Sequence, residues 1–216
     1  MLSALLIAYN NTINFWPPFH SWAYVPCNLA LTVALVVLSG PSPPPGSVAD
    51  AVVGLALAAP VALALLLVSG TRHRGLIADE RVAGLGGAVL AYHTLVRIPL
   101  GTAVTEEVLF RGVLFEAWLA AGSAPAGAAL WSALAFGLWH VAPSAIGLRL
   151  NDPEARPDHV AGVVAAAVVV SALAGLALTW LRLASGGLLA PIALHGAVNS
   201  GAAFAAARAG GPGPSA

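Results

Sequence analysis

The sequence predicts an all-α fold, a polytopic bundle of about seven transmembrane helices that forms a single membrane domain over residues 1–216. Hydrophobic residues make up 59% of the chain and charged residues only 8%, whereas soluble domains average about 45–50% and about 25%. In addition, apolar runs close to the ~20 residues that cross a bilayer alternate with short polar or proline-rich breaks. We therefore expect an integral membrane protein surrounded by lipid.

The N-terminal segment 1–22 is predicted to lie at the membrane interface rather than to cross the bilayer. Its apolar run is too short to span, and Trp16 and Trp22 are typical of the boundary between lipid and water. The basic stretch and cleavage site of a secretory signal are both missing from this segment, so we expect no signal peptide.

Seven apolar runs follow, and each is bounded by residues that end helices or prefer water, such as the proline-rich segment 40–46 and the charged segment 72–81. The predicted spans are 24–38, 48–69, 82–100, 103–121, 126–141, 160–183 and 188–207. Pro99 stands near the end of the third run and separates it from the fourth. We expect 143–159 to be a polar loop and 210–216 to be a flexible tail.

The basic residues predict how the bundle is oriented. All nine are arginine, and together with the many alanines and glycines this is typical of a GC-rich bacterial genome. Three of them lie in the segment 72–81, and loops that carry positive charge stay in the cytoplasm. We therefore predict a bacterial plasma-membrane protein with a cytoplasmic N-terminus.

Composition also excludes two kinds of site. The formal net charge is zero and the chain contains no basic run interleaved with aromatic residues, so we expect no nucleic-acid partner. Cys27 is the single cysteine, which excludes an internal disulfide and a metal site built from cysteines.

Two adjacent carboxylates, Glu106 and Glu107, interrupt the fourth predicted span together with Arg111. An ionised carboxylate at the bilayer centre costs roughly 2.5–3.5 kcal/mol. Glu107 and Arg111 are four residues apart and share a helix face, while Glu106 is turned about 100° away. The pattern predicts a paired Glu107 and a Glu106 that is free for chemistry. A helix start at the membrane edge is the alternative, since acids favour the first turn.

Three further polar residues, His140, His195 and Asn199, lie in later spans. His195 and Asn199 are four residues apart on one face, and His140 comes from a different helix. A bundle can bring them to Glu106 around one buried point. A carboxylate, two imidazoles and a carboxamide can hold and activate a water molecule, and the same set can bind a divalent metal such as zinc.

These residues form three motifs in order: Glu106-Glu107-x-x-x-Arg111, Phe136-x-x-x-His140 and His195-x-x-x-Asn199. They resemble the motifs of the CAAX protease and bacteriocin-processing (CPBP, Abi-like) family of intramembrane endopeptidases, which includes the type II CAAX prenyl endopeptidase. The resemblance covers roughly residues 85–205, the expected catalytic core. It implies cleavage of a peptide bond in a membrane-associated peptide or protein.

The resemblance also implies roles for the motif residues. Glu106 would activate water with His140 as its partner, and His195 and Asn199 would stabilise the oxyanion or bind a metal. Glu107 and Arg111 would support the motif helix. Two mechanisms stay open: one with a divalent metal such as zinc held by Glu106, His140, His195 and Asn199, and one without a metal. The His-Glu-x-x-His pattern of zinc proteases is missing from the sequence.

The remaining polar residues have structural explanations, and the protein has one alternative function. Glu116 lies about 15 Å along the helix from Glu106 and is expected at the membrane edge or in an ion pair. We assign a structural role to His93 and Arg97, which share a face, and a packing role to Phe136. Intramembrane acids and histidines also build proton relays, so the alternative is a non-catalytic protein: a proton-coupled carrier or a protective immunity partner.

Overall fold

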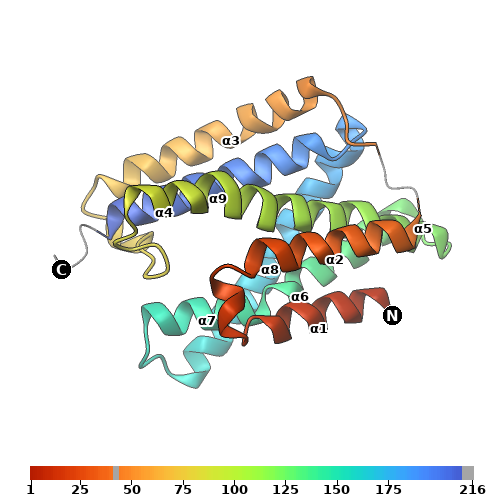
Figure 1. Cartoon of the computed structure of the whole chain (residues 1–216). Helices are drawn as coiled ribbons and strands as arrows, with labels where there is room; N and C mark the ends of the chain where they lie inside the picture. Colours follow the sequence, from red (N-terminus) through yellow and green to blue (C-terminus); the bar gives the residue numbers. More distant parts are fainter. Residues whose placement is uncertain (41–43, 211–216) are drawn as a thin grey trace.

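The computed structural model describes residues 1–40 and 44–210. Every regular element in these ranges is helical, which confirms the predicted all-α bundle. Figure 1 shows most of the long helices running side by side, with α2 next to the long helix that ends in α5. The helix α1 packs against α6. The predicted tail lies, apart from Gly210, outside the described residues, as does the stretch 41–43 of the proline-rich segment.

The elements follow one another along the chain with short connections. They are α1 (Leu2–Ile13), η1 (Pro17–His20), α2 (Tyr24–Ser39), α3 (Val48–Ser69), η2 (Arg74–Leu76), α4 (Gly87–Tyr92), η3 (His93–Val104), η4 (Glu107–Leu114), α5 (Phe115–Ala120), α6 (Pro125–Trp139), α7 (Val141–Asn151), α8 (Pro157–Ser185) and α9 (Leu189–Ala209). Of these, η1 and η2 are single 3₁₀ turns, whereas η3 and η4 are π-helical.

Four helices of the described chain are long and apolar enough to cross a membrane: α3, the α6–α7 pair, α8 and α9. The apolar helix α2 is shorter. On α3 and α8 large side chains such as Leu63, Leu67 and Val170 are more than half exposed, and an apolar surface of this extent requires lipid rather than water. The chain is therefore an integral membrane protein.

The prediction of separate spans over 82–100 and 103–121 is wrong, because α4, η3, η4 and α5 form one continuous helix from Gly87 to Ala120 (Figure 1). Pro99 does not break it. In a π-helix Pro99 would bond to the carbonyl of Thr94, five residues earlier, but proline has no N–H. Ser200 of α9 donates its hydroxyl to that carbonyl at 2.7 Å, so the carbonyl that Pro99 leaves without an N–H has another partner.

The predicted polar loop 143–159 is also wrong over its first half, which is the helix α7. Pro143 occupies the third position of this helix, where a backbone N–H has no partner within the helix and none is lost. The chain bends between α6 and α7 at His140, whose φ and ψ are −87° and 2°. Only residues 152–156 connect α7 to α8.

Small residues let the helices around the long central one approach closely. At Gly54 of α3 an added Cβ would collide with the carbonyl oxygen of Ala190 on α9, and these two helices pack along their length. Glu116 of α5 is ion-paired with Arg182 of α8, as one of the two sequence-based alternatives predicted.

Candidate active site

A buried ion pair fixes one side of the site. Glu107 and Arg111 are 0% and 1% exposed, and Nη1 of Arg111 donates to Oε1 of Glu107 at 3.0 Å. The same oxygen lies 2.7 Å from Nδ1 of His195 on α9. Because this oxygen also accepts from Arg111, it is an acceptor in the contact with His195, and Nδ1–H of His195 is the donor. The three side chains join two helices and set the orientation of the imidazole.

Glu106 has one carboxylate oxygen bound and one free. The indole N–H of Trp139 donates to Oε1 at 3.0 Å. Oε2 is buried and has no hydrogen-bond partner among the described residues. A buried polar atom left in this state costs about 1–3 kcal/mol. Oε2 is therefore the position at which a water molecule or a ligand would be held.

Two imidazole nitrogens converge on this free oxygen. Nε2 of His195 lies 3.7 Å from Oε2 of Glu106, and Nε2 of His140 lies 4.0 Å from it. Nδ1 of His140 faces the carbonyl oxygen of Phe136 at 2.8 Å; since a carbonyl only accepts, Nδ1 carries the proton and Nε2 of the neutral ring presents a lone pair. The structure thus brings together Glu106, His140 and His195 from three helical segments.

The ring of Phe136 fills the space between these groups. Its centroid lies 4.7 Å from that of His140 and 6.1 Å from that of His195, both edge-on. The guanidinium carbon of Arg111 lies 4.1 Å from the same centroid. The packing role predicted for Phe136 fits these contacts, and the ring limits how far either imidazole can turn.

The bend at His140 is held by two asparagines of α1. Asn10 donates to the carbonyl of Trp139 at 2.6 Å and Asn11 to that of Leu138 at 3.0 Å. Asn11 also accepts from the backbone N–H of Ala142 at 2.6 Å. Side chains of the N-terminal helix therefore satisfy the backbone groups that the bend leaves without helical partners.

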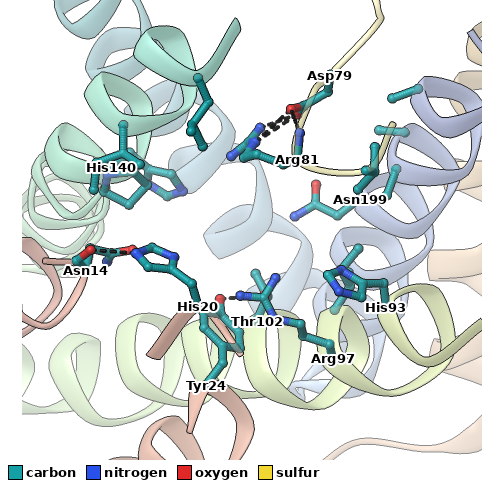
Figure 2. Close-up of a pocket in the computed structure, with 18 of the residues that line it drawn as sticks. Asn14, His20, Tyr24, Asp79, Arg81, His93, Arg97, Thr102, His140 and Asn199 are labelled. Carbon is teal, nitrogen blue, oxygen red and sulfur yellow. Dashed lines mark hydrogen bonds and ion pairs between the residues drawn. The ribbon is translucent and has the colours of Figure 1, made fainter. Parts of the chain in front are cut away.

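A cavity of about 790 Å³ leads from the loop after α3 to this cluster. Glu106, Trp139, His140 and Asn199 line it, and Figure 2 shows Asn199 and His140 on opposite sides of it. The carboxamide of Asn199 makes no hydrogen bond within the described chain, so it is available to a ligand. The structure does not bring Asn199 into contact with the Glu106 carboxylate.

Asp79 and Arg81 lie at the loop end of the cavity (Figure 2). Nε of Arg81 donates to Oδ2 of Asp79 at 2.9 Å, and Asn151 of α7 donates to Oδ1 at 3.3 Å. Burial alone would raise the pKa of Asp79, but hydrogen bonds from the side chain and backbone of Arg81 outweigh it, and the pKa of this carboxyl lies below its ordinary value. The loop is thereby tied to α7 across the cavity entrance.

The side chains of Glu106, His140 and His195 carry the types of atom that bind metals, but these atoms lie farther apart than the ligands of a zinc ion. Each imidazole has its second nitrogen held by an oxygen, the arrangement that orients metal-binding histidines. Ligands at ~2.1 Å from a tetrahedral zinc lie about 3.4 Å apart, however, and the separations here are 3.7 and 4.0 Å. Within the ranges that the structure describes, no group of three or more His, Cys, Asp or Glu residues is close enough to hold a metal ion.

Three residues of the site were not predicted from the sequence: Trp139, Asn10 and Asn11. A tryptophan directly before the motif histidine has a donor that must find a partner when buried, and this was a usable signal. The asparagines offered none, because their partners are backbone groups about 130 residues away, at separations of 129, 127 and 131.

Comparison with known proteins identifies a family that matches this chain. The family model described as type II CAAX prenyl endopeptidase Rce1-like matches residues 88–201. No curated protein and no solved structure matches the chain. The matched range contains all three motifs and runs from α4 into α9.

Proposed function

The chain belongs to the type II CAAX prenyl endopeptidase Rce1-like family, and on this premise we propose that Glu106 and His140 activate a water molecule to hydrolyse a peptide bond in a membrane-associated peptide or protein. Membership of the family implies that the protein is an intramembrane endopeptidase. The roles of individual residues are our proposal, and the geometry supports them as follows.

The nucleophile would be held between two acceptors. Oε2 of Glu106 has no protein partner, and Nε2 of neutral His140 offers a lone pair 4.0 Å away. Two acceptors at about 2.8 Å from one water oxygen lie about 4–4.5 Å apart when the water donates both hydrogens. A water in this position turns its own lone pair toward the cavity, where a peptide carbonyl would enter.

Attack on the carbonyl forms the C–O bond, transfers a water proton to Glu106 or His140 and places negative charge on the carbonyl oxygen. His195 is suited to stabilise that charge, because Glu107 accepts from its Nδ1 and favours a ring protonated on both nitrogens. The free carboxamide of Asn199 supplies a second donor from the same helix. The proton held by Glu106 or His140 then passes to the departing amine as the C–N bond breaks.

Glu107 and Arg111 act as positioning residues in this proposal. They do not line the cavity. Arg111 donates to the Glu107 oxygen that also accepts from His195, so the pair fixes the place of that oxygen. The negative charge of Glu107 is compensated by Arg111, which limits the cost of placing both groups in an apolar interior.

If a divalent ion such as zinc is bound, Glu106, His140 and His195 are the residues whose atoms converge to hold it, with Asn199 at the edge of the set. Such an ion would polarise the peptide carbonyl and acidify water. The metal-independent route fits the observed spacing without any contraction of the site.

The cavity entrance is proposed to face the cytoplasm, because the loop around it carries Arg72, Arg74 and Arg81. Figure 1 shows that Met1 and this loop lie toward opposite ends of the bundle. A cytoplasmic loop therefore directs Met1 toward the other side of the membrane, and the predicted cytoplasmic N-terminus does not fit this orientation.

The convergence of Glu106, His140 and His195 on one unpartnered oxygen at the inner end of a cavity is the observation that carries the proposal. The test is cleavage of a prenylated fluorogenic reporter peptide by purified protein in detergent. Glu106→Gln is expected to lower kcat about 10²–10⁴-fold, as loss of a general base does. Glu116→Gln, on the same helix outside the cavity, is the control. Normal cleavage by Glu106→Gln would refute the assignment.

A further inference from the structure

Asn28 of α2 is a buried polar side chain that the proposed mechanism does not use. It is 2% exposed and donates from Nδ2 to the carbonyl of Gly101 at 3.0 Å. Gly101 lies five residues before Glu106 on the continuous helix from Gly87 to Ala120, and α2 runs beside that helix (Figure 1). Asn28 lies outside the range 88–201 that the family model matches, so the match gives this contact no role.

The carbonyl of Gly101 lies where the long helix changes its geometry. The segment that ends at Val104 is π-helical, whereas Thr105 and Glu106 are α-helical. A carbonyl accepts from the N–H five residues later in a π-helix and four residues later in an α-helix. One carbonyl is therefore passed over where the first pattern gives way to the second, and Gly101 is four residues before Thr105 and five before Glu106. A buried carbonyl of this kind needs a donor from outside its helix, and Asn28 supplies one.

The carboxamide of Asn28 is held on both sides. The hydroxyl of Tyr9, on α1, donates to Oδ1 of Asn28 at 3.0 Å. Because Oδ1 accepts there, the amino group of the carboxamide faces Gly101. An added Cβ at Gly101 would lie 2.8 Å from the ring of Tyr24 and 3.2 Å from Val25, so the glycine permits α2 to approach this closely. The hydrogen bonds join α1, α2 and the helix that carries Glu106.

The helix α1 also reaches the second residue of the proposed catalytic pair. Asn10 and Asn11, the two residues after Tyr9, donate to the carbonyls of the two residues before His140 at 2.6 and 3.0 Å. Three consecutive residues of one helix thus lead to the backbone beside Glu106 and to the backbone beside His140. The relative placement of these two side chains is therefore tied to α1.

We infer that Asn28 is a positioning residue that, together with Tyr9, fixes the direction of the Glu106 side chain relative to His140. The inference rests on the proposed function and gives the N-terminal helices a part in it. Asn28 does not line the cavity, so it acts through the backbone rather than on the substrate. Without Asn28 the carbonyl of Gly101 is left unpaired, and narrower turns that relieve this would rotate Glu106 about the helix axis.

The test is cleavage of the prenylated fluorogenic reporter by purified protein in detergent. Asn28→Leu removes both hydrogen bonds and keeps a side chain of similar size. We expect its kcat to fall about 10–10²-fold, as a small displacement of a reacting group does, with KM unchanged. Tyr9→Phe removes only a hydroxyl and should lower kcat by a smaller factor. Thr32→Val is the matched control and should keep the wild-type kcat, because Thr32 is buried on α2 and its hydroxyl donates within that helix, to the carbonyl of Asn28 at 2.8 Å.

A second background separates positioning from a loss of folded protein. Glu106→Gln lacks the carboxylate that Asn28 positions, so adding Asn28→Leu to it should change kcat by less than about twofold. A loss of folded protein would lower kcat by the same factor in both backgrounds. In addition, hydrogen exchange of the backbone N–H groups in 101–106 should be faster in Asn28→Leu than in wild type and unaltered in Thr32→Val.

Two results would overturn the inference: wild-type kcat in both Asn28→Leu and Tyr9→Phe, or an equal fold loss from Asn28→Leu in the wild-type and Glu106→Gln backgrounds. If Asn28→Leu does not fold, the kcat of the milder Tyr9→Phe decides alone. Faster exchange in 101–106 without any cleavage by wild type would contradict the endopeptidase mechanism and support the role of Asn28 in holding the helix. Cleavage by wild type with unchanged kcat in both variants would do the reverse.

Discussion

Nδ1 of His195 lies 2.7 Å from Oε1 of Glu107, although the two residues are 88 positions apart in the chain. This contact joins α9 to the motif helix inside the bundle. It leaves Nε2 of His195 directed at Glu106, 3.7 Å away. The side of the imidazole that faces Glu106 is thus oriented by a carboxylate that does not line the cavity.

Removing Arg111 alone should strongly lower the stability of the fold. Arg111→Met leaves Glu107 as an uncompensated buried charge, and we expect a loss of about 3–5 kcal/mol in the free energy of unfolding. The double variant Glu107→Gln/Arg111→Met should be less destabilised than Arg111→Met. Denaturant titration in detergent measures both. The pair of Glu116 and Arg182, in which the Glu116 side chain is 40% exposed, is the control. An additive double-mutant cycle at Glu107 and Arg111 would contradict the pairing.

Trp139→Phe should slow the reaction without unfolding the protein. It deletes the N–H that donates to Oε1 of Glu106 and keeps most of the packing. A hydrogen bond to a charged group is worth about 1.5–3 kcal/mol, so kcat should fall about tenfold or more. Trp118→Phe is the matched control, because the indole N–H of Trp118 has no partner in the described chain. Similar kcat values for the two variants would exclude a role for the indole donor.

Asn11→Ala should loosen the bend at His140. Asn11 both donates to Leu138 and accepts from the N–H of Ala142, so its loss leaves two backbone groups without partners. We expect faster hydrogen exchange at Ala142 together with a reduced kcat. Thr12→Ala changes an exposed neighbour on the same helix and should leave both unchanged. Unaltered exchange in Asn11→Ala would show that the bend does not depend on α1.

Asp79 should contribute stability to the loop in a pH-dependent way. Its pKa in the folded protein lies below its ordinary value, so its contribution is fully present above the unfolded value of about 3.9 and is lost as the pH falls through the lower folded value. For a partly exposed ion pair we expect roughly 0.2–1 kcal/mol. Asp79→Asn should therefore be less stable than wild type at neutral pH, and the difference should shrink as the pH falls below the unfolded value and through the lower folded pKa. A difference that grows toward acid pH would contradict this sign.

Activity should survive a strong chelator. The donor atoms are 3.7 and 4.0 Å apart, wider than the ~3.4 Å of a tetrahedral zinc site, and the proposed water needs no ion. Cleavage of the reporter before and after EDTA treatment, with metal analysis of the same sample, measures this. Loss of activity that zinc restores would instead assign Glu106, His140 and His195 to a metal.

Local patterns along the chain predicted a large part of this architecture. The four-residue spacing of Glu107 and Arg111 predicted their contact, and the apolar run 48–69 coincides with α3. These features depend on helical periodicity and hydropathy, which neighbouring residues determine. Glu116 was expected either at the membrane edge or in an ion pair, and the structure shows the ion pair. Arg182 could not be identified as its partner from the sequence.

Features that depend on distant partners were not predictable in this way. In the sequence, Pro99 predicts the end of a helix. The helix continues because the hydroxyl of Ser200, on another helix, donates to the Thr94 carbonyl that Pro99 leaves without an N–H partner. The bend at His140 depends on α1, and the unpaired state of Arg97 emerges only when every neighbouring helix is in place. In each case a polar group is satisfied, or left unsatisfied, by packing rather than by sequence neighbours.

The uninterrupted helix from Gly87 to Ala120 also makes the site sensitive to chain length. A single inserted residue between Arg97 and Glu106 would rotate one of them by roughly a quarter of a turn relative to the other. No loop between them can absorb the change. This part of the protein should therefore accept many exchanges of one amino acid for another and very few insertions or deletions.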